Sequence, residues 1–366
     1  MPGFTTHYLF GLKTYRSIKE GSLKTIIDNH RSAYMLGLQG PDIYFYYLPS
    51  LIGDGSKNIG SLMHESHVHD FYSRYLNEIE LIIHSKTDAS GLPSTSRYHY
   101  ETAIAYLAGF ICHYTLDYVS HPYIYGRTNY RIDDPDQLYY YARHRSLETR
   151  LDTFMLRHIK HLEPSQFKRI KALPKNRFES GFLSLMLCRC INDVFYLDTS
   201  RSIYKKVGMT RSKRYIDRLY YRDTRKNRVS PKTMQNIFNS VRLECRILDD
   251  RTGVKKELVK SIENKTVKYD LLSSLMSADS IEDTMDDLNL SHIPWRSPWE
   301  PDTDHTDSFP ELFCRAVKQC NESLSLLEQY NICLEEDHFN APLAKSILLD
   351  QLGNRSYHSG FDCNTV

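Results

Sequence analysis

The chain has 366 residues, 41% of them hydrophobic and 25% charged, with a formal net charge of +2. This composition is that of a soluble globular protein, and the charge balance indicates no class of partner. No run of about 18 apolar residues is present, which excludes a transmembrane helix.

The ends of the chain and its cysteines indicate a compartment. The first residues lack a basic stretch followed by an apolar core, so we expect no secretory signal. The 8 cysteines are scattered without a CxxC pair, which favours reduced thiols. We therefore expect a cytoplasmic location.

Stretches with helical periodicity dominate the chain, and strand-like alternation is scarce. Helices are predicted near residues 14–36, 60–84, 97–121, 136–162, 180–206, 211–222, 231–249 and 306–333. Pro122 directly after His121 favours a helix end there. Residues 266–305, with Trp295 and Trp299, predict an ordered loop. We expect one all-α, multi-helix domain over residues 1–333, followed by a loosely attached tail, 334–366.

Metal-ligand residue types recur in steps of four along two of these helices. His113, Asp117 and His121 form one run, and His144 and Glu148 form the other. On a helix, residues four apart share a face. An ionised Asp117 in an apolar helix is costly unless it is paired or bound to a metal. The pattern predicts a metal site between the two helices, and the alternative is that Asp117 pairs with a cationic histidine.

Other candidates stay open from spacing alone. His64, His67 and His69 each have the residue type and position of a ligand, and His64 and His67 share a face. Near the N-terminus, His7 is either a ligand or a hydrogen-bond partner. Asp152 shares a face with His144, where it either orients a ligand or forms a salt bridge with a nearby arginine.

Two features bear on substrate. Tyr44, Tyr46 and Tyr47 follow a Gly-Pro-Asp turn that ends at Asp42, and aromatic faces can hold a quaternary ammonium; the alternative for each ring is core packing. Between Arg201 and Lys232, 12 residues are Lys or Arg. Three interpretations of that segment stay open: a solvated helix face, a contact for an anionic membrane surface and a contact for nucleic acid.

The ordered motifs resemble the zinc-dependent phospholipase C family, in particular its unsecreted bacterial branch. The resemblance rests on His113-Tyr-Thr-Leu-Asp117-Tyr-Val-Ser-His121-Pro122 and His144-Arg-Ser-Leu-Glu148, and on residues 6–11, 40–42, 63–64 and 289–299. It covers roughly residues 3–333 and implies an all-helical fold with a cluster of zinc ions.

The resemblance also implies a ligand set. One zinc is held by Asp42, His64, His113 and Asp117. A second is held by His121, His144 and Glu148, and a third by Asp117, His7 and the chain terminus. Six residues precede His7, so we expect two ions to be better supported than three.

The function that follows is hydrolysis of a phospholipid-like phosphodiester by a metal-activated water, with Asp42 as the candidate base. Tyr44, Tyr46 and Tyr47 are candidate substrate-binding residues. The alternatives are a single-strand-specific zinc nuclease, whose nucleic-acid substrate is less favoured, and a non-catalytic protein that zinc stabilises. The expected partners are a phosphodiester substrate and, peripherally, an anionic membrane surface.

Overall fold

The protein is built almost entirely of helices. The structure, a computed structural model, describes residues 3–46, 59–84, 94–207, 229–250, 252–266, 269–270, 272–282, 285–336 and 339–365. Its α-helices are α1 (Phe4–Ser17), α2 (Ser22–Asn29), α3 (Arg31–Gly37), α4 (Ile59–Glu65), α5 (Val68–His84), α6 (Ser94–Arg127), α7 (Gln137–Lys160), α8 (Arg169–Ala172), α9 (Arg177–Val207), α11 (Pro231–Ile247), α12 (Val254–Thr266), α13 (Phe309–Glu336) and α14 (Ala341–Leu352). Three 3-10 turns, η1 (Gly40–Tyr46), η3 (Pro164–Gln166) and η4 (Ser273–Leu275), lie between them. The all-α prediction is confirmed.

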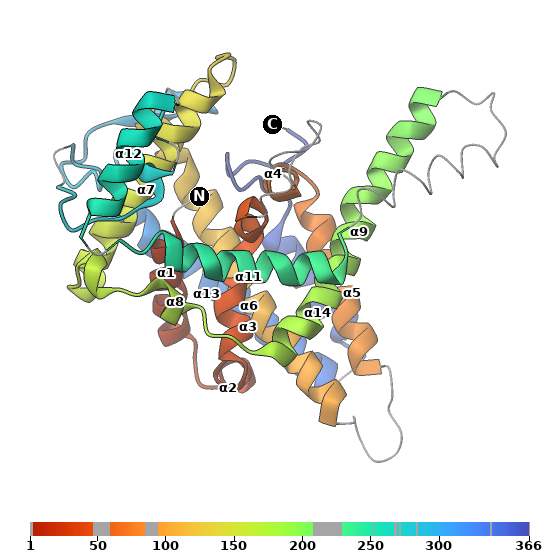
Figure 1. Cartoon of the computed structure of the whole chain (residues 1–366). Coiled ribbons are helices and arrows are strands. Elements are labelled where there is room, and N and C mark those ends of the chain that lie inside the picture. Colours follow the sequence, from red (N-terminus) through yellow and green to blue (C-terminus); the bar gives the residue numbers. More distant parts are fainter. Residues whose placement is uncertain are drawn as a thin grey trace.

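Helix α6 is the central element of the bundle. It packs against α3, α13, α1, α2 and α5, and α11 crosses the face that Figure 1 turns toward the viewer. The backbones of α3 and α6 approach closely at Gly37, where an added Cβ would lie 2.2 Å from the Tyr106 carbonyl oxygen. A larger residue would push the helices apart. This contact brings η1, which follows α3, against the middle of α6.

In the described part of the chain, β1 (Trp295–Ser297) pairs with β2 (Glu300–His305) to form a two-stranded antiparallel sheet. Trp295 is buried, its ring lies 5.2 Å from that of Tyr123 on α6, and its Nε1 donates to the Asp307 carbonyl. The segment predicted as an ordered loop over residues 266–305 is therefore held in place by Trp295. It also contains the short β1–β2 hairpin, which was not predicted.

Several helix boundaries differ from those predicted. The region 14–36 holds the end of α1 and two further helices, because the chain turns between Ser17 and Ser22. Helix α6 continues past Pro122 to Arg127. Pro122 removes one backbone hydrogen bond, but Tyr123 and Ile124 are fully buried, so core packing keeps the helix intact. The whole of the predicted helix 211–222 lies outside the described residues, as does most of the basic segment.

The C-terminal residues are not loosely attached. Helix α13 extends to Glu336, and α14 packs along α13 and α5. Leu348, Leu352 and Tyr357 are buried in the main hydrophobic core. The C-terminus ends beside α4 (Figure 1). The division of the chain at residue 333 stays a prediction. No helix in the described ranges is both long and apolar enough to cross a lipid bilayer.

Candidate metal centre

Four side chains from three elements converge on one point of α6. Asp42 comes from η1, His64 from α4, and His113 and Asp117 from α6, and each offers a ligand atom within 4.8 Å of the others. The Nε2 atom of His64 lies 3.2 Å from Asp42 Oδ1, and that of His113 lies 2.9 Å from Asp117 Oδ2. This first group has the nitrogen and oxygen donors that zinc takes in four-coordinate sites.

A second group lies one to two turns further along α6. It combines His121 with His144 and Glu148 of α7, and its ligand atoms also lie within 4.8 Å of one another. His144 Nε2 is 2.7 Å from Glu148 Oε1, and His121 Nε2 is 3.9 Å from the same oxygen. Three protein ligands are typical of a zinc site that keeps a position for water or substrate.

Backbone carbonyls orient three of these imidazoles. The Nδ1 atom of His64 is 2.6 Å from the Gly60 carbonyl, that of His113 is 3.1 Å from the Leu38 carbonyl, and that of His121 is 2.6 Å from the Tyr357 carbonyl. A carbonyl only accepts, so each Nδ1 must carry the proton. Each Nε2 is then the ring nitrogen that can ligate a metal.

The burial of these groups fits a metal. His64, His113, Asp117 and His121 are fully buried. The three Nε2 atoms and both oxygens of Asp117 form no hydrogen bond of normal geometry within the described residues. Buried polar atoms without partners are costly. A cation bound at each metal group would satisfy these atoms together. The donor atoms of both groups therefore fit zinc.

The protein itself already holds the carboxylates ionised. Burial raises the pKa of Asp117, but His113, His121 and His7 outweigh burial and hold the pKa well below its usual range. The pKa of Asp42 is likewise lowered, because His113 and His64 outweigh its burial. Both carboxylates are therefore charged at neutral pH, as metal binding requires.

His7 lies beside the first group without belonging to either. Its Nε2 is 3.2 Å from Asp117 Oδ1, and its ring stacks on His113 at 3.9 Å. Asp152 of α7 holds the start of α1 by accepting from the backbone N–H groups of Thr5 and Thr6, at 3.0 and 2.8 Å. Asp152 thus positions the helix that carries His7. Met1 and Pro2, and with them the terminus expected at a third ion, lie outside the described residues.

The same geometry distinguishes His64 from the two other candidate ligands near it, His67 and His69. His67 pairs with Asp70 at 2.9 Å on the surface, and His69 is in neither metal group. The three-way choice from spacing is therefore resolved in favour of His64.

Comparison with known families gives one match. The family model described as zinc dependent phospholipase C matches residues 6–197, just over half of the chain. The chain belongs to the zinc-dependent phospholipase C family. The resemblance seen in the motifs is confirmed, and all residues of both metal groups fall inside the match. Searches of curated proteins and of solved structures found no match.

This family member carries a cleft of about 760 Å³ beside the second metal group. His144 and Glu148 form part of its wall. Aromatic and aliphatic side chains form much of the remainder: Phe45, Leu62, Tyr125, Tyr130, Ile132, Leu138, Tyr140, Tyr141 and Trp299. A cleft of this size and composition is typical of a small-molecule or headgroup site.

Of the three tyrosines expected at the substrate, Tyr44 is the one whose side chain the structure describes. Tyr44 is 1% exposed and packs in the core, because the 3-10 turn η1 directs it inward and leaves Phe45 on the cleft. In the structure Tyr44 lies in the core and is not among the residues that line the cleft. The side chain of Tyr46, and the whole of Tyr47, lie outside the described part of the chain.

Several cleft residues were missed by sequence reasoning. Trp299 was predicted only as an anchor of a loop and Arg145 only as a salt-bridge partner of Asp152, and no role was predicted for Tyr125 or His358. His358 comes from the C-terminal segment, defined here as residues 353–365, and its ring lies 5.3 Å from that of His64. Burial, and then His64, lower the pKa of His358 to about 3, so the ring is neutral. No spacing in the sequence connects these residues, because they meet only through the tertiary fold.

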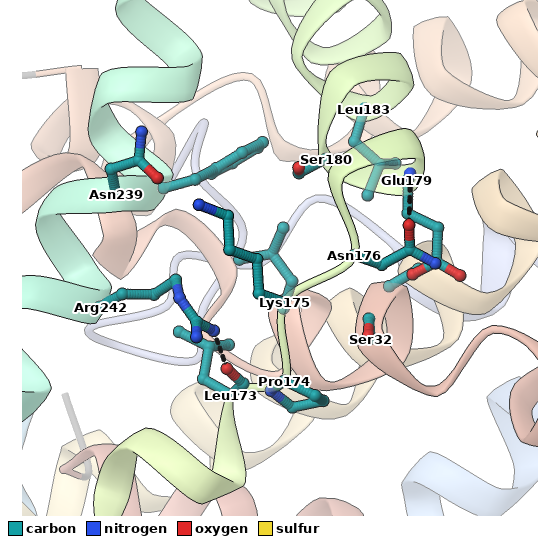
Figure 2. A pocket seen from close by; sticks show the side chains of 13 residues that line it. Ser32, Leu173, Pro174, Lys175, Asn176, Glu179, Ser180, Leu183, Asn239 and Arg242 are labelled. Atoms are coloured by element: carbon teal, nitrogen blue, oxygen red, sulfur yellow. Dashed lines mark hydrogen bonds between the residues drawn. The ribbon is translucent and has the colours of Figure 1, made fainter.

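A second cavity, between α3, α9 and α11, is far smaller. It has a volume of about 30 Å³, room for about one water. Figure 2 shows Lys175 and Arg242 at this cavity, with the Arg242 guanidinium donating to the Leu173 carbonyl. Its polar groups belong to the packing between these helices, and the metal-lined cleft is the candidate active site.

Proposed function

We propose that this zinc hydrolase cleaves phospholipid-like phosphodiesters. The observation that carries the proposal is the apolar and aromatic cleft that opens beside His144 and Glu148. Ile132, Leu138 and Tyr141 line it while keeping 51%, 45% and 42% of their surfaces exposed. Exposed apolar side chains at the rim of a cleft suit a lipid better than a water-soluble phosphoester.

The charge of the cleft argues against the nuclease alternative. Among the described residues that line it, Arg145 is the one Lys or Arg, and it stands against Glu65 and Glu148. Nucleic-acid clefts neutralise a run of phosphates with several cations. A single arginine is enough for one phosphodiester. It is held 4.2 Å above the Tyr141 ring, at the cleft wall.

Zinc, when bound, supplies Lewis acidity to the phosphoryl group and lowers the pKa of water. We propose two ions, one in each group; the third ion that the family resemblance implies would lie beside His7 and Asp117. Asp42 is the proposed base for the attacking water, because its carboxylate is ionised and belongs to the first group. His64 and His113 hold that carboxylate in place at 3.2 and 3.5 Å.

We also propose where the protein acts. The eight cysteines are unpaired thiols in the structure, which supports a reducing, cytoplasmic location. The basic segment 201–232 and the exposed apolar rim support peripheral contact with an anionic membrane surface.

The decisive experiment combines metal analysis with hydrolysis assays. Zinc is measured in the wild-type chain and in Asp117→Ala, and each is assayed on a chromogenic phosphodiester, on phosphatidylcholine vesicles and on single-stranded DNA. We expect Asp117→Ala to lose the zinc of the first group and all activity, because Asp117 Oδ2 faces His113 of that group; a third ion held between Asp117 and His7 would raise the loss above one equivalent.

Asp70→Ala is the matched control, since Asp70 is a surface carboxylate 62% exposed in its side chain. Diacylglycerol release by the wild type supports the proposal. Cleavage of DNA in place of lipid would favour the nuclease, and bound zinc without any hydrolysis would favour a purely structural role for the metal. Unchanged zinc in Asp117→Ala would contradict its role as a ligand.

A further inference from the structure

The C-terminal segment connects the two metal groups through its backbone. The Tyr357 N–H donates to the His64 carbonyl at 3.0 Å, and the Tyr357 carbonyl accepts from His121 Nδ1 at 2.6 Å. His64 belongs to the first group and His121 to the second. One residue of this segment therefore contacts a ligand of each group, although it lies outside the region that matches the family.

The segment is fixed against α6 by three further contacts. Tyr357 is 2% exposed. The Arg355 N–H donates to the Tyr114 hydroxyl at 3.0 Å, and the Arg355 guanidinium lies 5.0 Å above the Tyr118 ring. Gly360 has φ +75, and an added Cβ would lie 2.7 Å from the Tyr118 carbonyl oxygen. The segment is thus an ordered wall of the site.

Ser356 and His358 are the residues of this wall that line the cleft, and His358 is the one with an imidazole. It lines the cleft of about 760 Å³, and its ring lies 5.3 Å from His64 and 5.6 Å from His121. Its Nδ1 is 2.7 Å from the Tyr125 hydroxyl. Since Nδ1 is engaged by Tyr125, Nε2 is the ring nitrogen through which His358 can contact a ligand in the cleft.

His358 is placed for substrate rather than metal. The ligand atoms of each metal group lie within 4.8 Å of one another, and His358 belongs to neither group. Its position beside one histidine of each group is where an anion bridging the two sites would lie. Imidazole N–H groups are strong donors to phosphate oxygens.

We propose that His358 contacts the phosphate of the substrate, donating a hydrogen bond from Nε2 to a phosphoryl oxygen held between the two metal groups. In this arrangement the Tyr125 hydroxyl donates a hydrogen bond to Nδ1, which leaves the proton of His358 on Nε2. The proposal rests on the proposed function, because a phosphodiester must occupy this cleft. It assigns a substrate contact to the C-terminal segment, which lies apart from every metal ligand in sequence.

The test measures phosphate binding as well as activity. Binding of inorganic phosphate to the zinc-loaded, full-length chain is measured by calorimetry for wild type, His358→Ala and His358→Gln. We expect His358→Ala to keep wild-type zinc content and melting temperature, and to bind phosphate about ten-fold more weakly, which is the effect of one charge-assisted hydrogen bond. His358→Gln, which keeps an N–H donor, should recover part of the affinity.

Phe361→Ala is the matched control, because Phe361 lies on the same segment, 36% exposed and away from the cleft lining. Its phosphate affinity should equal that of the wild type. Equal affinity in His358→Ala and wild type would overturn the proposal, as would a wild-type chain that binds no phosphate. Loss of one zinc equivalent in His358→Ala would overturn it by making His358 a ligand.

The same measurements separate this proposal from the proposed function. A wild-type chain that cleaves phosphodiesters while His358→Ala binds phosphate normally refutes only the role of His358. A zinc-loaded wild type that binds phosphate through His358 but cleaves no phosphodiester refutes only the proposed function.

Discussion

Asp42 is the residue to which we assign two roles, metal binding and proton transfer. Its Oδ1 faces the Nε2 atoms of His64 and His113 at 3.2 and 3.5 Å. A carboxylate in this position can hold a metal, accept a proton or do both in turn. Substitution by an amide of the same shape separates the two roles, because an amide oxygen still ligates but does not take up a proton.

We expect Asp42→Asn to retain zinc when zinc is in excess and to lower kcat by about 10²–10⁴-fold, the contribution of a positioned base. Steady-state kinetics with metal analysis at saturating zinc checks this. Glu65→Gln, a cleft carboxylate outside both metal groups, should leave kcat near the wild-type value. Full recovery of kcat in Asp42→Asn at high zinc would show that Asp42 is a ligand and not the base.

A second charged cluster lies outside the two metal groups. His30 sits between Glu101 and Glu179, each 3.1 Å from one of its ring nitrogens. Burial lowers the pKa of His30, but the hydrogen bonds to Glu179 and Glu101 outweigh burial and raise the pKa above its ordinary value. Because the folded state binds this proton more tightly, the cluster stabilises the fold when His30 is charged.

This stabilisation is fully present below about pH 6.5, the unfolded pKa, and is lost as the pH rises through the higher folded pKa. We therefore measure the free energy of unfolding of wild type and His30→Gln in urea, from acid to alkaline pH. The difference between the two should become smaller as the pH rises. His99 is the opposite case on α6: burial lowers its pKa, so the stability that depends on it falls as the pH is lowered. A gap for His30→Gln that widens with pH would contradict the assignment.

At the scale of elements, α6 carries three of the seven residues in the metal groups and is contacted by the elements that carry most of the others. The i, i+4 steps along α6 and α7 pointed directly to five of the candidate ligands, because helical geometry converts sequence spacing into a shared face. Asp42 and His64 lie on separate short elements, and only the family resemblance joined them to α6. Their meeting depends on the close approach of α3 to α6, which spacing does not encode.

The same reasoning explains what the sequence did not predict. Pro122 reads locally as a helix end, yet buried neighbours carry α6 on to Arg127. The polar composition near the C-terminus resembles that of a tail, although Tyr357 is buried against α6. Tyr44 and Phe45 are equivalent aromatic residues until the direction of η1 is known. Each of these outcomes is set by tertiary packing, which overrides local pattern.

The C-terminal segment offers a test at this scale. In Gly360→Ala, the residue keeps a φ that L side chains rarely adopt, and its Cβ meets the Tyr118 carbonyl. We expect a loss of about 1–3 kcal/mol in the free energy of unfolding, together with weaker zinc binding at the second group. Chemical denaturation and zinc titration would measure both effects.

Gly181→Ala is a control of opposite sign. Gly181 lies inside α9, and the nearest atom to an added Cβ is 3.9 Å away. Alanine there should raise the free energy of unfolding by about 0.5–1 kcal/mol, because it favours the helix without a clash. If both alanine substitutions changed the free energy of unfolding in the same direction, this would contradict the positive-φ constraint at Gly360.

At the scale of the whole molecule, the metal groups connect distant parts of the chain. Their residues come from η1, α4, α6 and α7, and the carbonyls that orient them come from Leu38, Gly60 and Tyr357. Ions bound there contact the folded state but not the unfolded chain. Metal binding should therefore add directly to the stability of the bundle.

We expect the melting temperature to rise with zinc concentration and to fall on chelation. Zinc at one hundred times its dissociation constant adds about 2.7 kcal/mol per site. Differential scanning fluorimetry over a zinc series, with magnesium as the comparison ion, tests this. A melting temperature insensitive to both zinc and a chelator would mean that the buried carboxylates and imidazoles are stable on their own.

The hydrogen bond from His121 to the Tyr357 carbonyl has a consequence for the order of assembly on the ribosome. The side chains of the first metal group, and the carbonyls that orient them, are all synthesised by residue 117. The second group receives the partner of His121 only after residue 357 has left the ribosomal tunnel. The two halves of the centre are thus completed at different times, and a nascent chain carries the first long before it has the second.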